Sequence, residues 1–419
     1  MTKSAATQND TAAVGAQLIA PEDFDTAGNG WRECSLGEIA QINPTEKLVK
    51  GSIAKKIDMA ALQPFTKKPQ YVLTEPFNGG MKFKNGDTVI ARITPCLENG
   101  KTAYIDVLHD KEVGFGSTEY IVLREKDGLS DKQFLYYFAT SSVFRDVAIL
   151  SMTGSSGRQR VQTDVVTNHV FEIPPLPEQK AIAAVLSSLD DKIDLLHRQN
   201  QTLEAMAQTL FRQWFIEEVR EDWEEVALGD LISIKGGTTP STKEPKFWNG
   251  SICWTSPRDL STHSFVYMFD TERKITEDGL SQIGSGLLPI GTVLLSSRAP
   301  IGYLAIVEIP LAINQGYIAI ICDKTVSNLY MFLWCKANME TIKNAGNGST
   351  FEEISKSNFR DLSTKMPPKS LLVDFDNQAS PIFEKIKTNQ QQIQTLTQLR
   401  DTLLPKLMSG EIRVEVEYE

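Results

Sequence analysis

The chain has 419 residues, 41% of them hydrophobic, and 43 Lys and Arg against 53 Asp and Glu give a net charge of −10. This composition fits a folded protein of about two to three domains and excludes wholesale disorder, fibrous repeats and small disulfide-stapled scaffolds. The acidic total argues against a nucleic-acid partner, but residues 31–173 hold 18 basic and 17 acidic groups, so local basic surface remains available.

The cysteine spacing and the hydropathy of the sequence indicate in which cellular compartment the protein is expected. The five cysteines are scattered and form no C-x-x-C pair, which favours reduced thiols in a cytoplasmic protein and argues against a structural zinc site. No apolar run reaches about 18 residues, so neither a membrane span nor a secretion signal is expected.

Residues 1–30 are rich in Ala, Thr, Asn and Gly and are predicted to be a mobile tail. From Trp31 onward the chain contains an internal repeat. The segment Trp31–Ile39 returns 192 positions later as Trp223–Leu231, and the pair Pro174-Pro175 returns 193 positions later as Pro367-Pro368. Each half therefore holds one mixed domain followed by a further element.

The mixed domains, 31–175 and 221–368, alternate short Val, Ile, Leu and Tyr runs with Gly, Pro and Asn, which is typical of strands and turns. Helices are expected around 131–149 and 327–343, after the last strands. We therefore expect an α+β fold with a twisted sheet in each half.

The further elements are predicted to be long helices, over 176–220 and 369–412, each spanning about 60 Å at 1.5 Å per residue. Apolar residues recur at steps of four and three in both helices, and matched seams in a repeated chain favour burial against each other as an antiparallel coiled coil. Asn200, Asn389 and Arg400 interrupt the seams and are expected to fix the register. Pro405 is expected to bend or end the second helix near Leu404. The apolar seam residues are Leu189, Ile193, Leu196, Leu203 and Leu210 in the first helix and Ile382, Ile386, Ile393, Leu396 and Leu403 in the second.

Several motifs resemble one family. Ile173–Lys180, Leu189–Ile193, Asn200–Leu203 and Leu403–Ile412, in this order, are similar to segments of the specificity (S) subunit of type I restriction-modification enzymes, as are Gly236–Pro240 and Phe247–Gly250. The resemblance covers residues 31–413. The second linker, Met366–Ser370, departs from the pattern because it lacks the Leu-Pro-Glu-Gln of the first.

The resemblance implies two tandem, pseudo-repeated target-recognition domains separated by two long conserved helices, with residues 413–419 as a tail. Each domain is expected to read one half of a split site in double-stranded DNA. Methyltransferase (M) subunits, usually two, are expected to dock on the helices, with restriction and translocase (R) subunits joining them. S-adenosylmethionine and ATP then belong to these partners, and no cofactor is expected on this chain.

Catalytic interpretations find little support. Pro95–Thr102 ends like a P-loop but carries proline where the loop needs its first glycine. A carboxylate set at Asp259 and Glu272 with Lys274 is too loosely spaced to predict a nuclease. The four histidines are solitary, so no metal site is expected.

DNA contacts are expected from polar loops carrying Arg, Lys, Gln, Asn, Ser or Thr, since Arg reads guanine and Gln or Asn reads adenine. The first domain offers such residues in three places, and its strongest candidate is the glycine-rich loop 153–160. The candidates there are Lys67, Lys68, Gln70, Lys82, Lys84, Arg92, Ser155, Arg158, Gln159 and Arg160.

In the second domain a hydroxyl-rich basic turn precedes Phe247, and the loop 347–350 matches the glycine-rich loop 154–157 of the first half. One location is therefore expected to read both half-sites. Trp248 and Trp254 are favoured as core residues over base-stacking ones. The candidates are Thr238, Thr239, Ser241, Lys243, Lys246, Arg258, Arg298, Asn347 and Ser349.

Two alternatives remain at the level of the sequence. The chain could be a coiled-coil assembly scaffold that does not read DNA, or a stand-alone nuclease that depends on Asp259. Because the two domains are nearly neutral, we also expect the isolated chain to bind DNA poorly.

Overall fold

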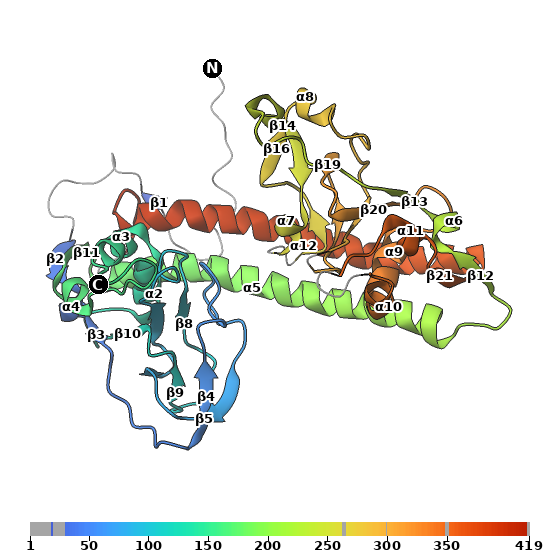
Figure 1. Cartoon of the computed structure of the whole chain (residues 1–419). Helices are drawn as coiled ribbons and strands as arrows, with labels where there is room; N and C mark the ends of the chain where they lie inside the picture. Colours follow the sequence, from blue (N-terminus) through green and yellow to red (C-terminus); the bar gives the residue numbers. More distant parts are fainter. Residues whose placement is uncertain (1–17, 20–29, 262–264, 299, 348–351, 417–419) are drawn as a thin grey trace. The chain divides into compact units, whose positions relative to one another are not determined.

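The computed structural model of the chain describes residues 18–19, 30–261, 265–298, 300–347 and 352–416. It divides into two compact units: the first joins residues 1–193 to 395–419, and the second runs from 194 to 394. Each unit is a mixed α and β domain that also holds one part of each of two long helices (Figure 1).

The first unit is built on two four-stranded sheets, ordered β3-β10-β7-β8 and β5-β4-β9-β6. A separate ribbon pairs β2 (Arg32–Ser35) with β11 (Val170–Ile173). The sheet strands are β3 (Ala40–Ile42), β4 (Ile53–Ile57), β5 (Leu73–Pro76), β6 (Lys82–Phe83), β7 (Thr88–Ala91), β8 (Thr102–Tyr104), β9 (Gly114–Gly116) and β10 (Tyr120–Glu125). The short helices are α1 (Leu36–Ile39), α2 (Lys132–Thr140), α3 (Ser142–Leu150) and α4 (Thr163–Asn168).

Side-chain alternation along β7 explains how these layers form, because successive residues of a strand face opposite sides of its sheet. Ile90 packs with Phe134 of α2 on one side. Val89 packs with Ile57 and Phe83 of the other sheet on the opposite side. The sheet β3-β10-β7-β8, which we call the central sheet, is therefore buried on both faces along β7, which is why Val89, Ile90 and Ala91 are all apolar.

The second unit has a five-stranded sheet, β13-β20-β17-β18-β15, and a three-stranded sheet, β16-β14-β19. Its strands are β12 (Glu224–Ala227), β13 (Ser233–Lys235), β14 (Trp248–Thr255), β15 (Tyr267–Met268), β16 (Arg273–Ile275), β17 (Val293–Ser296), β18 (Leu304–Val307), β19 (Leu311–Ile313), β20 (Tyr317–Ile321) and β21 (Ser363–Met366). Its short helices are α6 (Leu228–Leu231), the 3-10 turn η3 (Pro245–Phe247), α7 (Pro257–Ser261), α8 (Glu277–Leu280), α9 (Asn328–Ala337), α10 (Met339–Asn344) and α11 (Lys356–Arg360).

Both units repeat one topology. The antiparallel order β3-β10-β7-β8 returns as β13-β20-β17-β18. A parallel pair, β4 with β9, returns as β14 with β19, and the ribbon β2-β11 returns as β12-β21. The repeat and the α+β class predicted from the sequence are confirmed.

The helices expected after the last strand of each repeat are present, but each is divided in two. In the first unit α2 and α3 meet at Ser141, and in the second α9 and α10 meet at Asn338. Asp131 caps α2 by accepting from the Gln133 and Phe134 amides, and Ser327 caps α9 by accepting from the Tyr330 amide. These caps satisfy backbone donors that a helix start leaves unpaired.

The long helices are α5 (Leu176–Arg212) and α12 (Lys369–Met408). A short π-helical turn, η2 (Gln213–Glu217), continues α5. Both helices are shorter than the expected spans 176–220 and 369–412. The chain leaves the helical conformation at Glu218 after η2 and at Ser409 after α12.

Pro405 was expected to bend or end α12 near Leu404, and an end there is wrong. The helix continues past it to Met408. Proline removes one backbone donor, but its ring is exposed, and the next turn is held because Leu407 and Met408 are buried in the core of the first unit. Packing therefore outweighs the loss of one hydrogen bond.

Both predicted tails are altered by one short pairing. β1 (Leu18–Ile19) pairs antiparallel with β22 (Arg413–Val414), so neither segment is a free tail. Val414 is buried in the core of the first unit. The rest of the predicted tails, residues 1–17, 20–29 and 417–419, lies outside the described residues.

Candidate nucleic-acid interface

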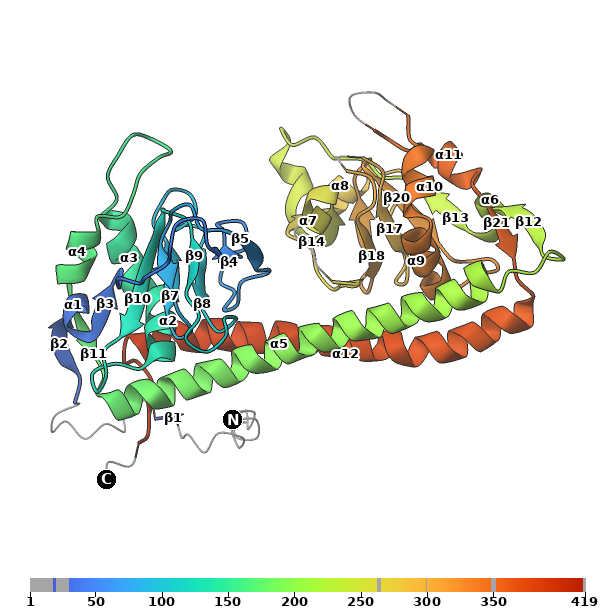
Figure 2. The ribbon, with the colours of Figure 1, turned by 90° about the horizontal axis from the view of Figure 1, so that it is seen from below.

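The strongest predicted reading loop, residues 153–160, follows α3 and projects from its unit (Figure 2). We call it the first loop. Its ends form a bridge, since Thr153 and Arg160 exchange two backbone hydrogen bonds of 3.0 and 2.9 Å. Gly154 and Gly157 have φ values of 132° and 77°, which only glycine adopts without strain. The sequence thus builds a closed hairpin-like loop.

The base of the first loop is fixed to the segment that follows β7. The Thr94 amide donates to the Gln159 carbonyl at 3.0 Å, and the Val161 amide donates to the Arg92 carbonyl at 2.9 Å. Ile93 and Arg160 also form an antiparallel bridge. The loop is therefore held on the central sheet by its backbone, and its tip side chains remain exposed.

The second unit holds an equivalent arrangement, which we call the second loop, residues 347–353. Asn347 and Glu353 exchange backbone hydrogen bonds of 2.9 and 3.1 Å. The backbones of Glu353 and Arg298 form an isolated antiparallel β-bridge, and the Ile354 amide donates to the Ser297 carbonyl at 3.0 Å. The predicted correspondence of the two locations is thus present in the backbone. Ser349 lies outside the described residues.

An ion pair supports each loop. In the first unit the Arg160 guanidinium contacts both carboxylate oxygens of Glu119 at 2.7–3.0 Å. These hydrogen bonds from Arg160 lower the pKa of Glu119. In the second unit the Arg298 guanidinium lies 3.5 Å from the Glu353 carboxylate. Arg160 and Arg298 therefore act as loop supports, and Glu119 is a residue that sequence reasoning missed because nothing local links it to position 160.

The side chains left open in the first loop are Ser155 and Arg158, which are exposed, and Gln159, which is half-buried. A guanidinium, an amide and a hydroxyl are the groups that read base edges and bind phosphates. The first loop therefore presents the chemistry that the sequence predicts for it.

The predicted lysine contacts of the first domain are largely engaged within the chain. Lys67 is only 7% exposed, donates to the Gln133 side chain at 2.8 Å and lies over the rings of Tyr104 and Tyr137. Burial lowers the pKa of its ammonium group. The structure contradicts a DNA contact at Lys67.

The remaining basic candidates of this domain are partly exposed, and Gln70 is exposed. Lys68 pairs with Asp106 at 3.5 Å, and Lys84 pairs with Glu46 at 2.7 Å. Lys82 donates to the Glu46 carbonyl, and Arg92 donates to the Val161 carbonyl. Because these side chains already make contacts within the domain, they are weaker candidates for DNA contact than the side chains of the first loop.

In the second unit the side chains of Trp248 and Trp254 donate hydrogen bonds to backbone carbonyls of the predicted basic turn. Trp248 donates to the Ser241 carbonyl at 3.0 Å and Trp254 donates to the Thr238 carbonyl at 3.3 Å. Both rings are buried, and the Arg273 guanidinium lies 3.6 Å from the Trp248 ring centroid. The tryptophans are core residues, as the sequence favoured.

The turn itself presents exposed polar groups. Lys243 and Lys246 are exposed, and Thr239 donates to the Gln315 side chain at 2.8 Å. Arg258, in α7, is exposed as well. The second unit therefore offers cations that the described structure leaves on its surface.

The seam residues of the long helices are all buried or half-buried within the chain, as are the polar residues that interrupt them. In the second unit Asn389 donates to the Asn200 side chain at 2.9 Å, and Asn200 donates to the Ile386 carbonyl at 3.3 Å. The seams are thus occupied by the chain's own packing, and a partner would have to use the outer faces of the helices.

In the first unit Arg400 and Asp190 form a buried ion pair at 2.7 Å, and the Tyr137 hydroxyl donates to the same carboxylate at 2.7 Å. Burial alone would lower the pKa of Arg400, but the Asp190 charge and hydrogen bond raise it. This pair joins α5 to α12 through Arg400, one of the residues expected from the sequence to fix the register of the two helices.

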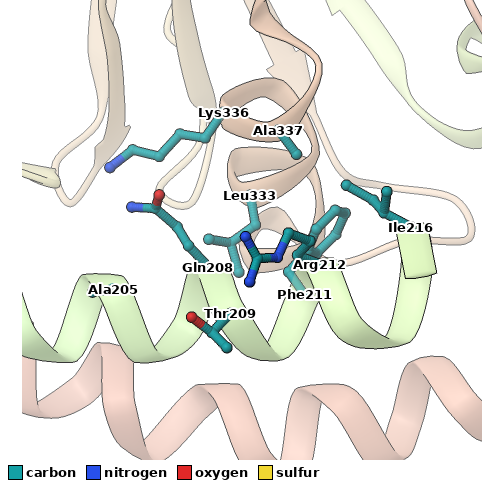
Figure 3. A pocket seen from close by; sticks show the side chains of 9 residues that line it. All are labelled: Ala205, Gln208, Thr209, Phe211, Arg212, Ile216, Leu333, Lys336 and Ala337. Atoms are coloured by element: carbon teal, nitrogen blue, oxygen red, sulfur yellow. The ribbon is translucent and has the colours of Figure 1, made fainter. Parts of the chain in front are cut away.

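The outer surface of the second unit contains a hollow of about 320 Å³ between α5 and α9. Its lining includes Phe211 and Arg212 from α5 and Leu333 and Lys336 from α9 (Figure 3). Lys336 also pairs with Glu204 at 2.7 Å. Three large apolar side chains of α5 and η2 are exposed: Leu195, Met206 and Ile216.

The described ranges contain no group of three His, Cys, Asp or Glu side chains arranged to hold a metal ion. Among the same residues, no helix is both long and apolar enough to cross a membrane.

Comparison with known families finds two copies of one domain. The family model described as "Type I restriction modification DNA specificity domain" matches residues 28–205 and 220–403. The two matched segments coincide with the two halves of the internal repeat and together cover most of the chain.

Relatives agree with this match. The HindI specificity subunit of Haemophilus influenzae is 24% identical over 405 residues, covering 78% of this chain and 87% of that protein. The MjaIX specificity subunit of Methanocaldococcus jannaschii is 38% identical over 162 residues, which span 38% of each chain. A solved type I restriction-modification S subunit from M. genitalium covers 93% of this chain with a TM-score of 0.57 at 16% identity, which shows a shared fold.

Proposed function

Because this chain belongs to the type I restriction-modification DNA specificity family, with two copies of its domain, we propose that it is the DNA-reading subunit of such a complex. Each domain reads one half of a bipartite site in double-stranded DNA. The observation that carries this proposal is the pair of equivalent loops, held by equivalent backbone bonds in the two units.

The two half-sites differ because the two loops differ. The first loop presents Arg158 and Gln159, whereas the second begins at Asn347 and is closed by Glu353. Different donors and acceptors read different base edges. The recognised sequence is therefore asymmetric.

The two long helices set the spacing between the half-sites as an antiparallel coiled coil. Support comes from the Asn200–Asn389 contact and the Asp190–Arg400 ion pair, which join α5 and α12 at two levels. Helices of 37 and 40 residues extend about 55–60 Å. A stiff element of this length can separate two modules by a helical turn of DNA, about 34 Å, or more.

Methyltransferase subunits, two per complex, dock on the outer faces of the helices, and restriction subunits join them. The hollow between α5 and α9 and the exposed Leu195, Met206 and Ile216 favour this surface, since exposed apolar side chains near cations suit a protein partner. S-adenosylmethionine and ATP are bound by these partners, in the cytoplasm, and this chain takes no part in bond making.

The decisive experiment is an exchange of residues 223–366 for the matching domain of a relative, followed by sequencing of the methylated motif. The proposal expects one half of the motif to change, with the other half and the spacer unchanged. A motif that stays whole would favour the alternative of an assembly scaffold that does not read DNA.

A further inference from the structure

Phe65 is an exposed aromatic residue held in an unusual backbone conformation. Its φ is 53° and its side chain is 44% exposed. A bulky residue at positive φ is strained, and such strain persists only where the surroundings fix it. The ring therefore occupies its position because the neighbouring residues hold it there.

The supporting contacts come from the segment 93–101. The Phe65 amide donates to the Gly100 carbonyl at 3.1 Å, and Pro64 forms an isolated antiparallel β-bridge with Lys101. The ring lies directly on Gly100: a Cβ atom at that glycine would stand 2.6 Å from the ring. Any other residue at position 100 would displace the ring.

A cation completes the support. The Arg145 guanidinium lies 4.9 Å from the Phe65 ring centroid. Its Nη2 atom donates to the Glu98 carbonyl at 2.8 Å and to the Leu97 carbonyl at 3.3 Å. Helix α3 and the segment 93–101 thus both contact the ring, and Phe65 is still 44% exposed.

The same segment carries the first loop. Thr94 donates to the Gln159 carbonyl, and Ile93 bridges Arg160. Phe65 and the exposed Arg158 are therefore mounted on one continuous support. An apolar ring, an arginine and a glutamine carried by one support match the groups of the major groove, where the thymine methyl is an apolar group among hydrogen-bonding edges.

Resting on the proposed function, we propose that the Phe65 ring contacts the methyl group of a thymine in the first half-site. It adds an apolar contact to the hydrogen bonds of the first loop. Because Phe65 belongs to the first unit, its contribution is confined to one half-site.

The test uses the complex of the full chain with its cognate methyltransferase subunits. Its first step is to determine the DNA motif that the wild-type complex methylates. Phe65→Asn removes the ring but keeps a residue that tolerates positive φ. We expect about tenfold weaker discrimination at one thymine of the first half-site, with the second half-site unchanged. Phe65→Trp keeps a ring and is expected to keep the preference. Val49→Asn, at a 77% exposed apolar position of the same unit, is the matched control.

A second measurement leaves the protein unchanged. Replacing each thymine of the first half-site by deoxyuridine removes only its methyl group. One such replacement should lower methylation by the wild-type complex about tenfold and leave the Phe65→Asn complex unaffected.

An unchanged motif in Phe65→Asn, or no effect of any deoxyuridine, would overturn the inference. Loss of methyltransferase co-purification with the motif intact would overturn it too, since Phe65 would then contact a protein. A wild-type complex whose methylation follows no motif would refute the proposed function itself, and the inference with it.

Discussion

At the scale of single residues, Arg158 and Gln159 of the first loop are the side chains proposed to read bases, since Arg158 is exposed and Gln159 is half-buried. Arg160 was predicted beside them, but its guanidinium is held by Glu119. Sequence composition predicted an exposed loop here because glycine, arginine and glutamine together are unusual in a core, and Arg158 is exposed. Composition could not show which arginine of the loop is held by an ion pair, since Glu119, the partner of Arg160, lies 41 positions away in the sequence.

Replacing Arg158 by Ala should weaken recognition of the first half-site by about 1–3 kcal/mol, as expected for one lost bidentate base contact. Competition methylation assays with single-base variants of the site measure this. Arg32→Ala, an exposed arginine on β2 of the same unit, is the control. Equal losses for both variants would show that charge alone is being measured.

Lys67 provides the opposite prediction. Since its ammonium is buried against Gln133 and two tyrosines, Lys67→Met should leave the methylated motif and the salt dependence of DNA binding unchanged. The sequence suggested a phosphate contact because a lysine run is usually solvated. A reduced salt slope in Lys67→Met would restore that interpretation.

At the scale of elements, the seams of the two long helices were predictable because a heptad pattern needs only local spacing. Their ends were not, because the last turn of α12 depends on burial of Leu407 and Met408 in a sheet domain remote in sequence. The pairing of β1 with β22 was missed for a similar reason: two-residue strands leave no periodic signal.

The Asp190–Arg400 pair should be the most sensitive contact between the helices. Arg400→Met leaves a buried carboxylate without its cation and should cost about 3–5 kcal/mol of stability. The double variant Asp190→Asn, Arg400→Met should cost less, because no charge is left buried. Thermal unfolding of the three proteins measures this, and a double variant that is less stable than the single one would contradict it.

At the scale of the whole molecule, recognition is divided between two domains that carry little net charge. The first holds 18 basic and 17 acidic groups over residues 31–173, and the second holds 13 and 15 over residues 223–366. Few phosphates can be neutralised by such surfaces. We therefore expect the methyltransferase subunits to supply much of the electrostatic attraction for DNA.

The purified chain should consequently bind its site weakly at physiological salt, and the complex with methyltransferase subunits should bind tightly. Fluorescence anisotropy with labelled duplex measures both. Nanomolar specific binding by the chain alone would show that its own loops supply the affinity.

The central claim, that this chain reads a split DNA sequence, is tested most directly by mapping methylated adenines across the genome of the source cell with and without its gene. The account predicts that deletion removes one asymmetric, bipartite motif and no other. An unchanged map, with the neighbouring methyltransferase expressed, would contradict it.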